Sequence, residues 1–239
     1  MKHSKRYDQA SEKVDPEALL SVPVAIDRVK ELATAKFDET VELAVRLGVD
    51  PRKADQIVRG TLSLPAGSGR YVRIAVFAAG EAAQEARDAG ADEVGADDLV
   101  AKVRGGFLDF DVAIATPDLM GQVGALGRVL GPRGLMPNPK TGTVTTEVGR
   151  AVGEFKAGRV EYRTDKVGNV HVRVGKASFD REDLIRNVHA VIDELSRVKP
   201  SSSKGRYLLS VTVSPTMGPG VKIDPLHARE VDDALEPAS

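Results

Sequence analysis

The chain has 239 residues, 41% of them hydrophobic, so it is long enough to form one large domain or two ordinary ones with a proper core. Cysteine and tryptophan are absent, which excludes disulfides, thiolate catalysis and zinc–thiolate sites. A net charge of −1 argues against a nucleic-acid-binding protein that relies on bulk charge. No apolar run has the length of a membrane span, so we expect a cytoplasmic protein with no membrane partner.

The charges are unevenly distributed along the chain. Residues 68–159 carry a net charge of −1 and residues 224–239 carry −4, so the remaining residues carry +4. This modest excess gives only weak long-range attraction to a polyanion. Any specificity for nucleic acid must then come from shape and directional contacts.

The first part of the chain mixes one helix with strands. Apolar residues at helical spacing predict an amphipathic helix over residues 23–34. Alternation with period two predicts a half-buried strand over residues 37–47, and a second strand is expected over residues 57–64. The Pro- and Gly-rich residues 65–69 then interrupt the chain.

A different pattern begins at Tyr71. The nearly continuous apolar run over residues 71–79 is typical of a strand that is covered on both faces. Alternating helices and strands follow, over residues 81–89, 93–94, 97–104, 112–115 and 147–155. Thr116 and Pro117 predict the N-cap and first position of a further helix. This order predicts a mostly parallel sheet and a Rossmann-like α/β unit.

The first pattern returns at Arg159. Residues 159–163 and 170–174 alternate on either side of a turn and predict a β-hairpin. A helix is expected from Asp180 to Leu195, and a last strand over residues 207–214. In that strand Leu209 is expected to face the core with Val211 and Val213.

We therefore predict a discontinuous α+β domain into which a Rossmann-like α/β domain is inserted. The first domain comprises residues 1–67 and 160–223, the inserted domain residues 68–159, and residues 224–239 form an acidic disordered tail. On pattern alone, a single continuous α/β domain remains the alternative.

The stretch from Arg128 to Thr143 is rich in glycine, proline and cations, and predicts a rigid, exposed, cationic loop. An ordinary connection is the alternative, since Gly and Pro are common in all loops. A nucleotide-binding P-loop does not fit, because Pro139 precedes Lys140 and has no N–H to donate to a phosphate.

Polar side chains gather on predicted strand faces of the first domain. Lys36, Thr40 and Glu42 share one face of an early strand, as do Ser210, Thr212 and Ser214 in the last strand. Hydroxyls, a carboxylate and an exposed methionine in the turn that follows suit A-form RNA. The alternatives are ordinary solvated strand faces and, for Phe37, a core position.

The string from Gln122 to Val144 closely resembles the signature of the ribosomal protein L-one family. KFDETVE from Lys36, DPRKADQ from Asp50 and TMGPG from Thr216 resemble motifs of the same family. The resemblance implies the inserted-domain arrangement and an RNA-binding surface made of Lys36, Phe37, Thr40, Glu42, Lys166, Ser210, Thr212, Thr216, Met217 and Gly218. The signature loop of the inserted domain would present Arg128, Gly131, Arg133, Gly134, Pro137 and Lys140.

The resemblance also implies a function. The chain would be a structural constituent of the large ribosomal subunit that binds large-subunit ribosomal RNA directly at the mobile stalk. It would assist release of deacylated tRNA from the exit site and repress translation of its own operon mRNA. Off the ribosome it would be a monomer.

Catalysis has no support in the sequence. The histidines lack metal-ligand spacing, no G-x-S-x-G elbow is present, and no G-x-G-x-x-G follows the strand that ends near Ala79. We expect no enzymatic activity, no cofactor and no metal. Two other classes remain as alternatives: an α/β enzyme or nucleotide-binding protein that uses the cationic loop, and a protein-interaction module that binds no RNA.

Overall fold

The computed structural model describes residues 4–229, except the side chain of Lys140. The chain separates into two compact units: unit 1 joins the residues up to Gly69 with those from Val160 onward, and unit 2 spans Arg70–Arg159. Both units are mixtures of helices and strands, which confirms the predicted fold class. Across the described residues, no helix is both long and apolar enough to cross a membrane.

Unit 1 is built on an antiparallel sheet with the order β7-β1-β8-β9. Its strands are β1 (Thr40–Leu47), β7 (Asn169–Lys176), β8 (Leu208–Pro215) and β9 (Val221–Ile223). Its helices are α1 (Lys5–Ser11), α2 (Val22–Leu32) and α8 (Arg181–Arg197), with a 3-10 turn η1 over Ala54–Gln56. The predicted central strands and the two long helices are therefore present.

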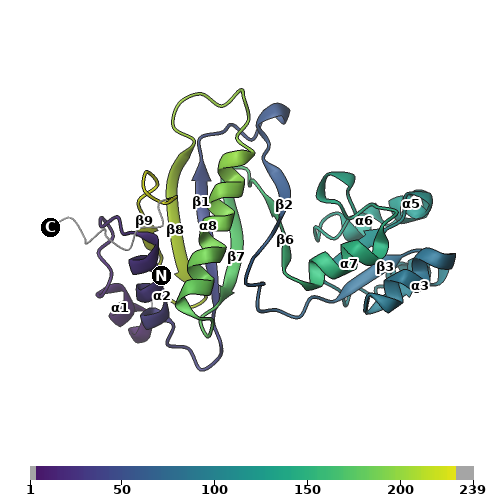
Figure 1. The fold of residues 1–239 in the computed structure, drawn as a ribbon, viewed down its shortest axis with the longest axis horizontal. Helices are drawn as coiled ribbons and strands as arrows, with labels where there is room; N and C mark the ends of the chain where they lie inside the picture. The colour runs from purple at the N-terminus through teal and green to yellow at the C-terminus, as the bar shows by residue number, and fades with distance from the viewer. Residues whose placement is uncertain (1–3, 230–239) are drawn as a thin grey trace. The chain divides into compact units, whose positions relative to one another are not determined.

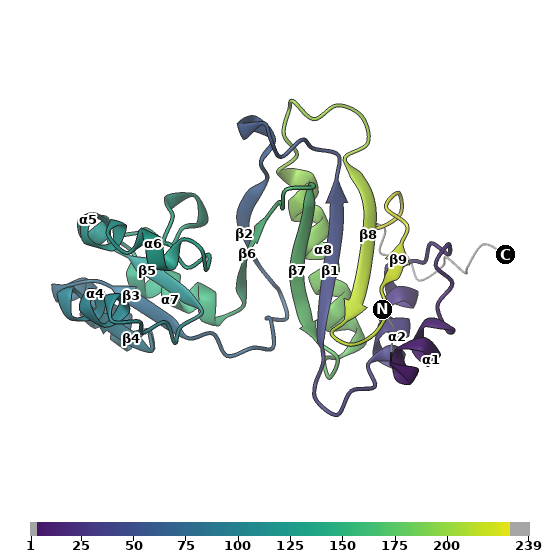
Figure 2. The same ribbon diagram turned by 180° about the vertical axis from the view of Figure 1, so that it is seen from behind.

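One face of this sheet is covered and the other is not. In β1, Val41, Leu43, Val45 and Leu47 are buried and alternate with more exposed residues. These side chains share one core cluster with the apolar sides of α2 and α8. Figure 1 shows α8 in front of the strands, and Figure 2 shows the opposite face with the strands in front. Period-two alternation in the sequence follows from this one-sided burial.

Two short elements of unit 1 had no recognisable signal in the sequence. Helix α1 buries none of its residues, so it carries no apolar period, although Ser4 accepts a hydrogen bond from the Tyr7 N–H at its start. Strand β9 has three residues. It is held by its pairing with β8 and by bonds to Leu20.

The predicted β-hairpin around Lys166 is only partly correct. Strand β6 (Arg159–Arg163) pairs with β2 (Arg59–Ser63) in a separate two-stranded sheet, whereas β7 pairs with β1. An isolated bridge joins Thr164, just after the first predicted hairpin strand, to Val170 at the start of the second. Local alternation predicts a strand but does not say which strand is its neighbour, and here the partners come from far along the chain.

The expected burial of Leu209 is also wrong. Leu47 pairs with Leu208 and Arg46 pairs with Ser210, so Leu209 lies at a bulge. Its side chain is exposed. An extra residue in one strand breaks the alternation at that point, and a single sequence does not show it.

Unit 2 contains a parallel sheet in the order β4-β3-β5, as the alternating pattern predicts. Its strands are β3 (Ile74–Phe77), β4 (Glu93–Gly95) and β5 (Val112–Ala115). The main helices are α3 (Gly80–Asp88), α4 (Asp97–Arg104) and α7 (Val148–Lys156). Alternate residues of β3 belong to two different apolar clusters, Ala75 and Phe77 to one, Ile74 and Val76 to the other. Both faces of the sheet are therefore covered.

The helix expected after Thr116 is broken into short pieces. A 3-10 turn η2 (Pro117–Leu119) leads into α5 (Met120–Gly124) and α6 (Gly127–Leu130). Thr116 occupies the N-cap position, but its side chain makes no capping hydrogen bond. Glycine weakens a helix, and Gly124 and Gly127 flank the break between the two pieces.

The tail predicted to be disordered from residue 224 begins with an ordered turn. Asp224 accepts the Leu226 N–H at 2.8 Å, Ala228 is buried in the unit 1 core, and Arg229 pairs with Asp193 of α8 at 3.0 Å. The prediction is therefore wrong for residues 224–229. Residues 230–239 lie outside the described residues.

Candidate nucleic-acid interface

The uncovered face of unit 1 brings side chains from all of its strands together. The strand register places Glu42 opposite Arg173 on one side and Ser214 on the other. The next outward row joins Ala44 with His171 and Thr212, and Thr212 lies opposite Lys222 of β9. Further along, Arg46 pairs with Ser210. The predicted residues Glu42, Ser210 and Thr212 therefore share one surface.

The uncovered face also carries cations that the sequence analysis did not single out. They are Arg46, Arg173 and Lys222, and the His171 side chain lies on the same face. Among the residues that the structure describes, no ion-pair partner is found for Arg46, Arg173 or Lys222. A signal was present, because His171 and Arg173 alternate with the buried valines of β7. It identifies an outward side chain but not the sheet face that the side chain joins.

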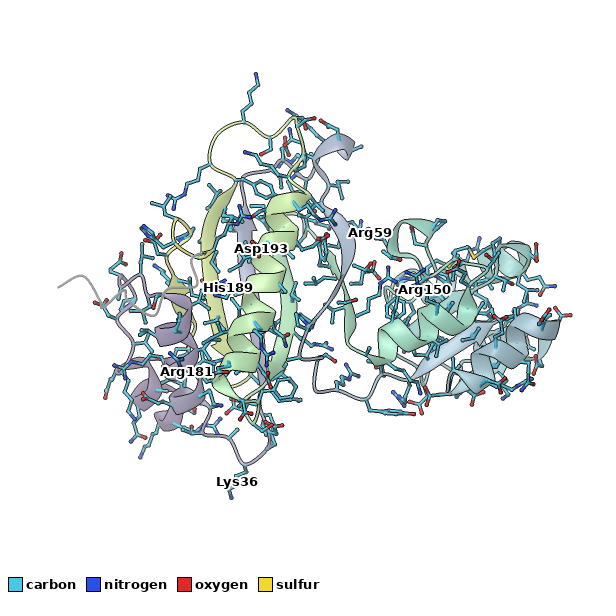
Figure 3. The ribbon with its side chains drawn as sticks, viewed as in Figure 1. Lys36, Arg59, Arg150, Arg181, His189 and Asp193 are labelled. Atoms are coloured by element: carbon cyan, nitrogen blue, oxygen red, sulfur yellow. The ribbon has the colours of Figure 1, made fainter. Side chains whose placement is uncertain are left out.

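The segment ahead of β1 forms one end of this surface. Lys36 projects from the loop before β1, as Figure 3 shows, so the prediction that it lies on a strand face with Thr40 and Glu42 is wrong. Phe37 is 54% exposed, so the alternative of a core position is wrong for this residue. Met217, in the turn after β8, is 49% exposed. Large apolar side chains with this exposure are available to a partner.

A buried carboxylate ties these two segments together. Glu39 is 1% exposed, and its two carboxylate oxygens accept the Ala35 N–H and the Met217 N–H, each at 2.8 Å. Thr216 adds a second tie, because its hydroxyl accepts the Thr40 N–H at 2.9 Å and donates to the Thr40 carbonyl at 3.2 Å. The loop before β1 and the turn after β8 are thus one connected structure.

Lys176 and Ser178 hold the same loop from the β7 side. Lys176 Nζ donates to Thr40 Oγ1 at 2.9 Å and to the Asp38 carbonyl at 3.3 Å. The Ser178 hydroxyl and N–H both donate to the Asp38 carboxylate. The backbone around Phe37 is therefore fixed from two sides.

Gly218 is required by packing. A Cβ atom at this position would lie 2.6 Å from Cγ of Pro215 and 3.4 Å from the Leu32 carbonyl oxygen. The proline ring does not move away easily. The turn after β8 is therefore seated closely against the end of α2.

Lys166 lies apart from the other predicted contacts. It follows β6, in a turn next to the end of β1, where the Leu47 N–H donates to Gly168. Thr40, at the other end of the eight-residue strand β1, is about 25 Å away along it. Asp165 accepts the N–H groups of Asn169 and Val167, and these bonds lower the pKa of the Asp165 carboxyl.

The signature loop of unit 2 is exposed at its tip and buried at its base. Arg128, Gly131, Arg133 and Gly134 are exposed, whereas Pro137 is buried. Within the described part of the chain, Arg128 and Arg133 have no ion-pair partner. The side chain of Lys140 lies outside the described residues, and its backbone belongs to the 3-10 turn η3 (Pro139–Thr141).

Two buried hydroxyls close the base of this loop. Thr143 Oγ1 accepts the Asn138 N–H at 2.8 Å, and both Thr141 and Thr143 donate to the Asn138 carbonyl at 3.1 Å. The loop then joins the sheet, since the Ala115 N–H donates to the Thr143 carbonyl. These bonds hold residues 138–143 together at the base of the loop.

The structure combines an uncovered polar sheet face in unit 1 with an exposed loop in unit 2 that carries Arg128 and Arg133. In residues 4–229, no group of three or more His, Asp or Glu side chains could hold a metal ion.

Residues 29–219 match the Ribosomal protein L1p/L10e family, and the chain belongs to this family, as the sequence resemblance indicated. It is similar to the Large ribosomal subunit protein uL1 of Cutibacterium acnes, with 60% identity over 97% of this chain and 100% of the relative. The proteins of the same name from Thermobifida fusca and Mycolicibacterium smegmatis are 56% and 58% identical, each over 98% of this chain and at least 99% of the relative. The chain is a member of a ribosomal protein family and not an enzyme.

Proposed function

We propose that this chain is a structural constituent of the large ribosomal subunit in the cytoplasm, and that it binds large-subunit ribosomal RNA through the uncovered face of unit 1. The printed name of its relatives supports the first part. The single observation that supports the second is the convergence of β1, β7 and β8 on one uncovered face, next to exposed Phe37 and Met217.

The chemistry of this face suits A-form RNA better than a protein partner. Hydroxyls of Ser210, Thr212 and Ser214 stand in a row and can exchange hydrogen bonds with 2′-hydroxyl and phosphate groups. Arg46, Arg173 and Lys222 add positive charge at close range. Phe37 provides a flat apolar surface on which a base can stack.

The two threonines at the end of the face have different roles. Thr216 donates its hydroxyl hydrogen to the Thr40 carbonyl, so it shapes the turn and has no hydrogen left to offer. Thr40 accepts from Lys176, which directs its own hydrogen away from the ammonium group. We infer that Thr40 donates to an RNA oxygen and that Thr216 positions Met217.

A salt-dependent titration against large-subunit ribosomal RNA, with unrelated structured RNA as competitor, tests this function. We expect competitor-resistant binding with a shallow dependence on salt, because directional contacts dominate. Weak binding, or equal binding to both RNAs, would contradict the proposal.

We also propose that unit 2 contacts tRNA leaving the exit site through the signature loop. The supporting observation is a rigid loop that holds Arg128 and Arg133 exposed and without ion-pair partners among the described residues. An Arg128→Gln, Arg133→Gln double variant should weaken tRNA binding and leave ribosomal RNA binding unchanged. Equal tRNA binding by the variant and the wild-type chain would oppose this role.

A third proposal is that the free monomeric chain represses translation of its own operon mRNA by binding that mRNA on the ribosomal RNA surface. One surface serving two RNAs requires competition between them. Ribosomal RNA should therefore displace the mRNA from the chain stoichiometrically, and a complex that holds both RNAs would contradict the proposal. Sedimentation of the RNA-free chain at the mass of one copy checks the monomeric state.

A further inference from the structure

Glu39 stands out among the buried polar residues of unit 1. It is 1% exposed and, within the described residues, has no cation within ion-pair distance. Its partners are two backbone N–H groups, Ala35 on the α2 side and Met217 on the β8 side. Its own backbone carbonyl accepts the Ala177 N–H at 2.8 Å. One residue thus contacts three segments that are far apart in the sequence.

A carboxylate satisfies both amides at once. Each oxygen accepts one N–H, and a charged acceptor makes such bonds stronger than a neutral one does. A glutamine side chain has a single carbonyl oxygen, so its amide nitrogen would face one of the two donors. One buried N–H would then lose its partner.

We propose that Glu39 is a positioning residue for RNA recognition: it does not touch the RNA but holds the Phe37 loop and the Met217 turn in the mutual arrangement that the RNA contacts. This inference rests on the proposed ribosomal RNA binding by unit 1. The exposed Phe37 lies two residues before Glu39, and the exposed Met217 is the residue whose N–H Glu39 accepts. A small rotation of either segment therefore displaces one of these two side chains.

The sign of the expected effect separates this role from simple electrostatics. Removing a negative charge from a protein that binds a polyanion strengthens binding through Coulomb attraction. Loss of pre-organisation has the opposite effect, because the RNA must then order both segments itself. For Glu39→Gln we expect ribosomal RNA affinity to fall roughly tenfold or more.

The experiment compares the full-length wild-type chain with Glu39→Gln and with Glu182→Gln. Glu182 is an exposed carboxylate in the first turn of α8, so the control makes the same change of charge without a buried bond. RNA affinity is measured by titration and the exchange of the Ala35 and Met217 amide hydrogens by NMR. We expect Glu39→Gln to weaken binding and speed exchange at Met217, and Glu182→Gln to leave affinity equal or slightly higher.

A double-mutant cycle distinguishes positioning from a general loss of stability. Met217→Ala should cost affinity in the wild-type background and much less in the Glu39→Gln background, because the contact has already been displaced. Equal costs in both backgrounds would overturn the inference, as would Glu39→Gln binding that matches the Glu182→Gln control.

The free wild-type chain provides a test even if the Glu39 variant does not fold. We expect the Met217 amide to be protected from exchange before RNA is added. Rapid exchange in the free chain, with protection only in the complex, would overturn the positioning role. Wild-type chain that fails to bind ribosomal RNA at all would overturn the proposed function itself, and the inference with it.

Discussion

The two units expose their binding groups in different ways because their sheets are covered differently. In unit 1 helices pack on one face of an antiparallel sheet, so the strands themselves present side chains to a partner. In unit 2 the parallel sheet is buried on both faces, and only the loops remain available. The register of the strands determines which side chains lie together on the face of unit 1, whereas the loop of unit 2 is stabilised by hydrogen bonds within the loop.

The buried polar residues reflect the same difference. Glu39 accepts the N–H of Met217 across 178 positions of the sequence. Thr143 accepts the N–H of Asn138, only five positions away. The unit 1 surface therefore depends on the folding of its whole unit, and the signature loop of unit 2 is close to self-contained.

The largest expected effect comes from the cores. Phe77 is fully buried in unit 2, so Phe77→Ala should destabilise that unit by about 3–5 kcal/mol. Leu43→Ala in β1 should cost unit 1 about 2–5 kcal/mol and weaken ribosomal RNA binding at temperatures where unit 1 begins to unfold. Calorimetry and RNA titration of both variants measure these effects. If Phe77→Ala abolished ribosomal RNA binding while unit 1 stayed folded, the proposal that unit 1 alone provides the ribosomal RNA surface would be contradicted.

A smaller effect is expected at the base of the signature loop. Thr143→Val removes the acceptor of the Asn138 N–H and should cost about 1–3 kcal/mol in local opening of residues 138–143. Hydrogen exchange resolves the opening by position. Thr145→Val is a suitable control, because the Thr145 hydroxyl accepts the Glu147 N–H, which lies outside the base of the loop. Faster exchange throughout β1 or β8 would show that the loop is not self-contained.

Removing one charge from the uncovered face should have a smaller effect still, on the salt dependence of RNA affinity. Arg173→Gln removes one cation opposite Glu42 and should reduce the slope of log affinity against log salt by about 1. Arg186→Gln on α8 is the matched control, since that arginine already pairs with Asp183. Salt titrations of both variants decide the matter. Equal slopes for the two variants would remove Arg173 from the RNA surface.

The smallest effect is a difference in pH response. Burial lowers the pKa of His189 on α8, against the opposing attraction of Asp193 one turn away (Figure 3). The folded chain then binds fewer protons at this site than the unfolded chain, so the free energy of unfolding falls as the pH drops through about 6.5. Unit 2 contains no histidine. Lowering the pH from about 7.5 to about 5.5 should lower the melting temperature of unit 1 more than that of unit 2. The His189→Phe variant should show a smaller difference between the two units.

The sequence was informative wherever one residue type repeats with a clear period. The run from Tyr71 predicted a strand buried on both faces, and the alternation after Thr40 predicted one that is half exposed. The local pattern did not indicate that β6 pairs with β2 and not with β7, because strand pairing depends on residues that are far apart in the sequence. The sequence did not single out Glu39 for the same reason. Its carboxylate accepts the Met217 N–H, which the fold brings close from 178 positions further along the chain.

The most direct test of the account is an NMR titration of isotope-labelled chain with large-subunit ribosomal RNA. We predict that resonances of the Phe37 loop, the outward residues of β1, β7 and β8, and the Met217 methyl group shift together, while α2 and α8 stay unchanged. Shifts confined to the helical side of unit 1 or to the signature loop of unit 2 would contradict the assignment of the RNA surface.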